Sequence, residues 1–456
     1  MESKNKVNLI TEKPSRALLL FALPMILGNL FQQFYNMADS MIVGRFVGED
    51  QLAAVGASYS LTTVFIMISI GGGMGASILT AQYLGAKRYR EMKTSITTAL
   101  ISFLFVSIVL AAFGLIFHRG ILMALGTPEN IMKDASVYLN IYFCGLPFLF
   151  MYNVLSAMYN ALGDSQKPLY FLIFSSVLNI LLDLFAVKVL EAGVAGVAWA
   201  TLIAQGISSV LSFTVLMRKL RQYGELEEKQ TIFASSFLLE MIKLAIPSML
   251  QQSIVSIGML LVQSVVNGFG SSVLAGYSAA SRVESICVVP MIAVGNAMST
   301  FTAQNLGAGK IERVKEGYRA SYKIIFTIAI LICVILTCSH TWLIQCFLGE
   351  DGGKTAYETG TAYLSFIAFF FILIGLKAST DGVLRGSGDV VFFTVSNLVN
   401  LSIRVAAAHA LAGIIGVQAV WIAIPLGWGV NYILSYVFYR RGKWKKTRVL
   451  KEAPKA

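Results

Sequence analysis

The sequence predicts an all-α integral membrane protein in which twelve transmembrane helices form two pseudo-symmetric six-helix bundles. The prediction rests on an apolar composition, twelve long apolar segments and an internal repeat. Of the 456 residues, 56% are hydrophobic and 13% are charged, whereas soluble domains carry roughly 25% charged residues. A soluble core of this size could not bury so much apolar surface. The composition therefore excludes a soluble enzyme, a secreted disulfide scaffold and a disordered chain.

Twelve segments reach the roughly 20 apolar residues that a helix needs to cross a bilayer. They are Ala17–Val43, Leu52–Leu84, Ile96–Phe117, Val137–Leu162, Leu169–Val187, Val194–Leu216, Leu238–Phe269, Val273–Leu306, Ile324–Phe347, Tyr363–Leu384, Val391–Leu411 and Ile414–Tyr439. They lack the period-2 alternation of barrel strands, so we expect helices. The five cysteines lie in or near these segments, and we expect buried packing thiols.

The basic residues predict the orientation of the chain. One set of loops and both termini hold 28 of the 36 Lys and Arg residues, and the opposite loops hold five. Cytoplasmic loops carry the excess of Lys and Arg, so we expect a plasma-membrane protein with both termini in the cytoplasm. The net charge of +12 is then a signal of topology, and we expect no nucleic-acid partner.

An internal repeat divides the spans into two sets of six. The stretch Thr80–Ala86 recurs as Thr302–Ala308, and Leu23-Pro24 recurs as Ile246-Pro247. Because six is even, both halves have the same orientation, related by an axis along the membrane normal with a cavity at their interface. We predict an N-terminal lobe at residues 1–222 with spans 1–6. A C-terminal lobe at residues 223–456 begins with a cytoplasmic linker and holds spans 7–12.

Polar residues one helical turn apart mark three spans of the first half. The first span carries Gln32, Tyr35, Asn36 and Asp39 on one face, the fifth carries Asn179 and Asp183, and the sixth carries Thr201 and Gln205. Carboxylate, amide and hydroxyl oxygens suit a small hard cation such as Na⁺, and acids inside membranes also serve as proton relays. The alternative is a hydrogen-bond network that only holds the helices together.

The repeat favours the functional interpretation of these acids. At the repeat offsets, Asp39 corresponds to Val262 and Asp183 to Arg404. Because the second half lacks both carboxylates, we place a cation or proton coupling site in the first half, at the pair Asp39 and Asp183.

Other polar residues inside the spans have weaker assignments. We expect Asn153 and Glu284, with Gln32, Tyr35, Asn36 and Gln205, to line a substrate cavity. Lys377 and Asp381 lie four residues apart and should pair with each other. Pro24 removes a helix hydrogen bond in the first span, so it is either a hinge or a static kink.

The sequence lacks the motifs that several other functional classes require. No nucleophile–base pair or metal-ligand motif occurs within the spans, so we expect no enzyme and no cofactor. A passive channel would need a selectivity filter, and no such motif is present. No loop is long enough for an ATPase domain, so transport would draw on an ion gradient.

The ordered set of motifs resembles the MATE (multidrug and toxic compound extrusion) family of antiporters. The resemblance runs from span 1 to span 12. It is carried by Leu23-Pro24 with Asp39 and Gly44, by Gln82–Ala86 and Gln304–Ala308, by Asn179 with Asp183, and by Leu384–Asp389. It implies a V-shaped MATE-like fold of two six-helix bundles. It also implies export of organic cations or drugs by alternating access, driven by H⁺ or Na⁺.

The resemblance also assigns roles to individual residues and leaves one alternative function open. It places the coupling site on Asp39, Asn179, Asp183 and Thr201, and a bend of the first span at Pro24. The branch with acids in the C-terminal lobe is not matched, because Val255 and Ile374 occupy its acidic positions. We expect a monomer whose partners are small organic cations or drugs and membrane lipid. The alternative is a flippase for lipid-linked oligosaccharides or lipids in the same superfamily.

Overall fold

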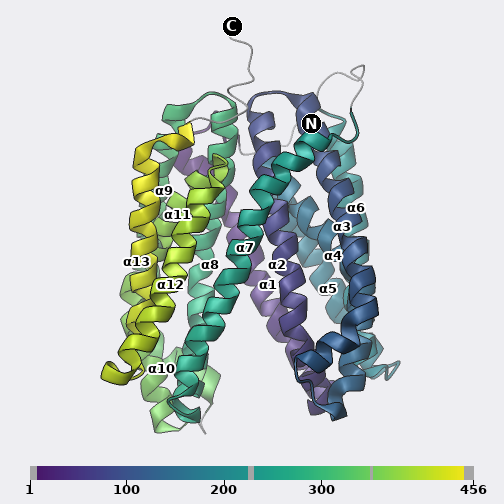
Figure 1. The fold of residues 1–456 in the computed structure, drawn as a ribbon, viewed down its shortest axis with the longest axis vertical. Coiled ribbons are helices and arrows are strands. Elements are labelled where there is room, and N and C mark those ends of the chain that lie inside the picture. The colour runs from purple at the N-terminus through teal and green to yellow at the C-terminus, as the bar shows by residue number, and fades with distance from the viewer. Residues whose placement is uncertain (1–7, 224–230, 350–352, 446–456) are drawn as a thin grey trace. The chain divides into compact units, whose positions relative to one another are not determined.

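The computed structural model describes residues 8–223, 231–349 and 353–445, and its regular elements in these ranges are helices (Figure 1). They are α1 (Pro14–Phe46), α2 (Glu49–Gly85), α3 (Tyr89–Ala124), α4 (Glu129–Ala161), α5 (Gln166–Lys188), α6 (Gly193–Leu220), α7 (Ser235–Asn267), α8 (Ser271–Gly307), α9 (Ile311–Leu348), α10 (Lys354–Ile367), η1 (Ala368–Phe370), α11 (Phe371–Gly386), α12 (Val390–Ile415), α13 (Gln418–Arg441) and η2 (Lys443–Lys445). The middle of the predicted cytoplasmic linker, residues 224–230, lies outside the described residues.

Twelve helical segments of the described chain are long and apolar enough to cross a membrane, which confirms the predicted fold class. The tenth span is α10 and α11 joined by the 3₁₀ turn η1, a break that the hydropathy pattern did not predict. Several helices begin before their apolar segments. For example, α9 begins at Ile311 rather than Ile324, because its first turns carry charged residues that a helix can hold outside the hydrocarbon region.

The chain divides into two compact units. The α3–α6 unit comprises Leu27–Thr80 and Arg88–Met249. Within it, α3 packs on α4, and α6 packs on both α4 and α5. The α8–α13 unit comprises Met1–Ile26, Ala81–Lys87 and Leu250–Ala456. Within this second unit, α8 packs on α9, α10 and α11, while α12 packs on α13.

Two helices with internal prolines are shared between the units. The unit boundary in α1 falls between Ile26 and Leu27, just after Pro24, and the boundary in α7 falls between Met249 and Leu250, just after Pro247. These prolines are repeat partners. The lobe boundary at residues 222 and 223 is a separate division, based on sequence similarity, and it stays a prediction.

The described chain from Leu9 to Phe21 packs firmly within the α8–α13 unit. Leu9, Leu18 and Phe21 are each at most 1% exposed and belong to the core of that unit. Asn305, near the end of α8, donates from Nδ2 to the Leu9 carbonyl at 3.0 Å. The first turns of α1 therefore pack with helices of the second repeat.

The two copies of the repeated Ala-Gln-x-Leu-Gly-Ala motif, from Ala81 and from Ala303, meet inside the α8–α13 unit. A Cβ on Gly85 would lie 1.9 Å from the Gln304 carbonyl oxygen, and one on Gly307 would lie 2.0 Å from the Gln82 carbonyl oxygen. Both neighbours are backbone atoms that no rotamer change can move. The motif thus repeats a glycine because each copy needs close contact with the backbone of the other.

The expectation of buried cysteines was wrong for three of the five. Cys144, Cys338 and Cys346 are exposed on the described surface. The physical reason is that lipid tails are as apolar as the protein interior, so nothing drives such side chains to the centre of a bundle.

Candidate functional site

A polar cluster joins α1, α5 and α6 inside the α3–α6 unit. The side chains lie one helical turn apart on each helix, so each helix presents them on a single face. The Tyr35 hydroxyl donates to Asn179 Oδ1 at 2.7 Å, and Asn179 Nδ2 donates to Thr201 Oγ1 at 3.2 Å. Asn179 is 2% exposed and links residues from three helices.

The Asn179 amide has a second orientation that satisfies more partners. Turned over, its nitrogen donates to Asp183 Oδ2 at 3.0 Å, and its oxygen accepts from the Thr201 amide nitrogen at 3.1 Å and from Thr201 Oγ1 at 3.2 Å. Amide nitrogen and oxygen are assigned from their surroundings, and the second arrangement gives the buried carboxyl of Asp183 a donor. Asn179 therefore positions Asp183 in the cluster.

Two carboxyl groups face each other beside Asn179. The side chains of Asp39 and Asp183 are within hydrogen-bonding reach of each other, and Asp183 is fully buried. Among the described residues, Asp39 Oδ1 and Asp183 Oδ1 are buried oxygens without a hydrogen-bond partner. Two ionised carboxylates about 4 Å apart repel by about 4 kcal/mol at an effective dielectric constant near 20. A shared proton or a bound cation would relieve this repulsion and occupy the unpartnered oxygens.

A small cavity adjoins the cluster. Its volume is about 40 Å³, and it is lined by Gln32, Tyr35, Tyr152, Leu172, Ser175, Ser176, Asn179, Thr201, Ala204 and Gln205. A water molecule needs at least about 10–15 Å³ of such volume, whereas sites for drug-sized ligands occupy about 300–1,000 Å³. This cavity is therefore suited to a few waters or a partly hydrated ion.

The structure places the other predicted residues of the first half as follows. Asn36 accepts a hydrogen bond from Gln32 Nε2 at 3.0 Å on the same face of α1. Asn153 donates from Nδ2 to the Leu149 carbonyl of its own helix at 2.9 Å, and it is absent from the residues that line the small cavity. The neighbouring Tyr152 lines the cavity instead.

Sequence reasoning missed Tyr138, Tyr152 and Ser175. Tyr138 lies within electrostatic range of both acids, while Tyr152 and Ser175 line the cavity. Ser175 was detectable, because it lies one turn before Asn179 and two turns before Asp183 on the same face of α5. The two tyrosines belong to α4, a helix of mixed polarity whose inward face the sequence does not mark.

Glu284 lies in the α8–α13 unit and has its own partners there. The Tyr363 hydroxyl donates to Glu284 Oε2 at 2.6 Å, and Arg404 is within electrostatic range. The Tyr363 ring lies 6.0 Å from the Trp421 ring, centroid to centroid. Glu284 is thus held by α10, with Arg404 of α12 as the nearby positive charge.

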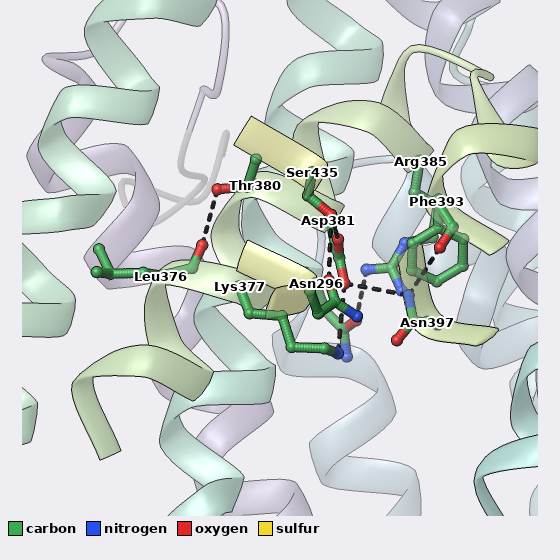
Figure 2. A network of polar contacts seen from close by, with 10 residues as sticks. Asn296, Leu376, Lys377, Thr380, Asp381, Arg385, Phe393, Asn397 and Ser435 are labelled. Carbon is green, nitrogen blue, oxygen red and sulfur yellow. Dashed lines mark hydrogen bonds and ion pairs between the residues drawn. The ribbon is translucent and has the colours of Figure 1, made fainter. Parts of the chain in front are cut away.

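Figure 2 shows a second polar network of this unit, centred on Asp381. Lys377 Nζ lies 3.3 Å from Asp381 Oδ2, which confirms the predicted pair. Asn397 Nδ2 donates to Asp381 Oδ2 at 3.2 Å, and Ser435 Oγ donates to Asp381 Oδ1 at 2.6 Å. Both carboxylate oxygens of Asp381 are satisfied, so this buried acid links α11, α12 and α13 and leaves no open coordination position.

Comparison with known proteins identifies the family. A family model described as MatE matches residues 24–185 and again residues 247–409. The chain belongs to the MatE family. The second match begins 223 residues after the first, in agreement with the internal repeat, and the predicted family resemblance is confirmed.

The MatE chain is similar to two Bacillus subtilis (strain 168) proteins along almost its whole length. It is 31% identical to "Probable multidrug resistance protein YoeA", with 97% of each chain covered. It is 30% identical to "Probable multidrug resistance protein YpnP", covering 96% of this chain and 97% of that protein. A solved structure described as "Crystal structure of MATE in complex with MaL6" shares the fold. It has a TM-score of 0.90 and 23% identity, and covers 98% of this chain and 100% of that one.

Proposed function

We propose that this MatE-family protein is a secondary active multidrug exporter rather than an enzyme. It moves organic cations or drugs out of the cell by antiport with H⁺ or Na⁺ through alternating access. Support comes from the two Bacillus subtilis relatives, both named probable multidrug resistance proteins. The basic loops and termini support a plasma-membrane location with cytoplasmic termini.

The observation that carries the coupling proposal is the pair Asp39 and Asp183. Each acid has a buried oxygen without a partner among the described residues, and the Thr201 hydroxyl and Asn179 amide lie beside them. A hard monovalent cation would take these oxygens as ligands. A proton would bridge the two carboxyls. In either case the site binds one positive charge, and the inward gradient of that ion can drive the export of drug.

The small cavity beside the acids supports a division of labour. At about 40 Å³ it suits the coupling ion with a few waters, so the organic cation binds elsewhere. Exchange then depends on a conformational change that the ion controls. Pro24 is the residue at which we propose that α1 bends. Pro24→Ala should leave membrane insertion intact and lower transport, whereas unchanged transport would remove the hinge from the mechanism.

Transport in proteoliposomes tests the proposal. Wild type, Asp39→Asn and Asp183→Asn are each reconstituted into vesicles. The vesicles are loaded with a fluorescent organic cation, and a pH or Na⁺ gradient is imposed across their membrane. Glu358→Gln serves as the matched control, because Glu358 is an exposed acid with 66% of its side chain accessible. Both aspartate variants should lose gradient-driven efflux and the control should keep it, while the effective gradient identifies the ion.

Two other outcomes would contradict the proposal. Full efflux in both aspartate variants would move coupling away from this site. Absence of efflux in correctly inserted wild type, for every cation tested, would favour the flippase alternative, which a lipid-scrambling or flipping assay on the same vesicles would then examine.

A further inference from the structure

A groove lies between α9 and α11 on the outside of the α8–α13 unit. Its volume is about 400 Å³, and it is lined by Tyr322, Lys323, Phe326, Thr327, Ile372 and Leu376. Phe326 is 55% exposed, so the groove opens at the surface of the helix bundle. The α9–α11 groove combines an apolar wall with a single positive charge and plays no part in the coupling site.

The position of Lys323 along α9 places it at the edge of the membrane. It is the last charged residue before residues 324–347, a stretch that contains no Asp, Glu, Lys or Arg. At 1.5 Å per residue this stretch is about 36 Å long, enough to cross a hydrocarbon core of about 30 Å. Lys323 is therefore at the level of the lipid headgroups, and Phe326 and Thr327 face the first part of the acyl chains.

A second cation continues the charged end of the groove. Arg319 lies one turn before Lys323 on the same helix face, and both are exposed. Within the part of the chain that the structure describes, neither belongs to an ion pair of 4 Å or less, although Lys315, one turn earlier, pairs with Glu312 at 2.6 Å. Lys323 and Arg319 are thus available for an external anion.

The repeat shows that these cations are special to α9. At the motif offset of 222 residues, Lys323 corresponds to Ile101 of α3 and Arg319 to Thr97. Ile101 is 43% exposed, as expected for an ordinary lipid-facing position. A merely structural basic belt would serve both repeats equally, whereas only the second repeat carries basic residues at these two positions.

Hydrogen bonds to neighbouring helices hold the wall of the groove in place. The Tyr322 hydroxyl contacts Tyr432 at 3.0 Å and also bonds to Tyr318, and Tyr318 reaches Thr380 of α11 at 2.7 Å. These bonds use the Tyr322 hydroxyl internally and hold its ring in place. The groove is therefore preformed rather than created by a mobile side chain.

We propose that the α9–α11 groove binds one anionic phospholipid. Its phosphate lies against Lys323 and Arg319, and an acyl chain lies along Phe326, Ile372 and Leu376. Basic pockets between transmembrane helices on the cytoplasmic side are suited to such headgroups. This lipid site is independent of the transport activity proposed above.

Lipid titration by native mass spectrometry tests the affinity. Delipidated protein in neutral detergent receives phosphatidylglycerol or phosphatidylcholine, and bound lipid is counted for wild type, Lys323→Gln and the double variant with Arg319→Gln. Each lost charge should weaken phosphatidylglycerol binding about fivefold, which corresponds to about 1 kcal/mol per basic residue. Lys323→Arg keeps the positive charge and should bind phosphatidylglycerol as wild type does. Lys243→Gln is the matched control, because Lys243 is an exposed lysine of α7.

A photoactivatable phosphatidylglycerol tests the position. Cross-linked peptides should come from residues 319–330 and 371–377 in wild type and should be lost in the double variant. Equal binding of the two lipids would overturn the proposal, as would an equal loss in Lys243→Gln or cross-links that map elsewhere.

Discussion

Replacing Gly307 by alanine should destabilise the crossing of the two repeated motifs. The added Cβ would lie 2.0 Å from the Gln82 carbonyl oxygen, so the backbones must separate by about 1 Å to reach ordinary contact. Overpacking of this kind costs about 1–3 kcal/mol. The shift would also strain the bond from Gln82 Nε2 to the Gly386 carbonyl, now 3.1 Å, at about 1 kcal/mol. We expect a total near 3 kcal/mol.

The assay is thermal unfolding in detergent, followed by tryptophan fluorescence and by loss of the monodisperse peak. Gly413→Ala is the control, because Gly413 lies in α12 with no atom within 4 Å of its added Cβ, and its helix should gain up to about 1 kcal/mol. A Cβ on Gly85 would lie 1.9 Å from the Gln304 carbonyl oxygen at the same helix crossing. The Gly85→Ala, Gly307→Ala double variant should therefore lose less stability than the sum of the two single losses. A Gly307→Ala protein as stable as Gly413→Ala would refute the reasoning.

Three further predictions concern single side chains. Tyr35→Phe removes the hydroxyl that is hydrogen-bonded to the Asn179 side-chain amide and should weaken the apparent affinity for the coupling ion about fivefold, or about 1 kcal/mol; unchanged affinity in the efflux assay would exclude a role for it. Lys219→Met leaves Asp164, whose side chain is 14% exposed and now lies 2.6 Å from the Lys219 ammonium, without its cation and should cost about 3 kcal/mol of stability. An unaltered melting temperature would disprove this. Burial raises the pKa of Asp389, so the folded state favours its protonated form and loses stability as pH rises through that pKa. Asp389→Asn should therefore melt above wild type at pH 8 and with it below about pH 4, and the reverse order would contradict the sign.

The fold was largely accessible from hydropathy and repeats, because lipid forces every span to satisfy its own backbone. What hydropathy cannot register is a change of helix type within an apolar run, such as η1 at Ala368–Phe370. Nor does it register burial, because Cys144 is apolar enough for either side of a helix. The division of α1 and α7 between compact units arises from packing between distant segments, which no local pattern encodes.

The candidate site was predictable where helical spacing alone decides. Tyr35 with Asp39 and Asn179 with Asp183 are each one turn apart, so their shared faces follow from the sequence. The contact between those faces depends on how α1 and α5 pack. The choice between Asn153 and Tyr152 on α4 depends on the rotation of that helix, and a single residue of register reverses it.

The binding of Leu9 by Asn305 has a consequence for the order of assembly. The two residues are 296 positions apart, so the start of α1 is synthesised long before the helices that bury it. Leu18 and Phe21 therefore contact lipid, or the insertion machinery, until α8 and α9 have been synthesised and inserted. Docking of the first segment made therefore cannot precede the synthesis of α8. A nascent chain stopped before residue 305 should expose the peptide around Leu9 to protease, and the full-length chain should protect it.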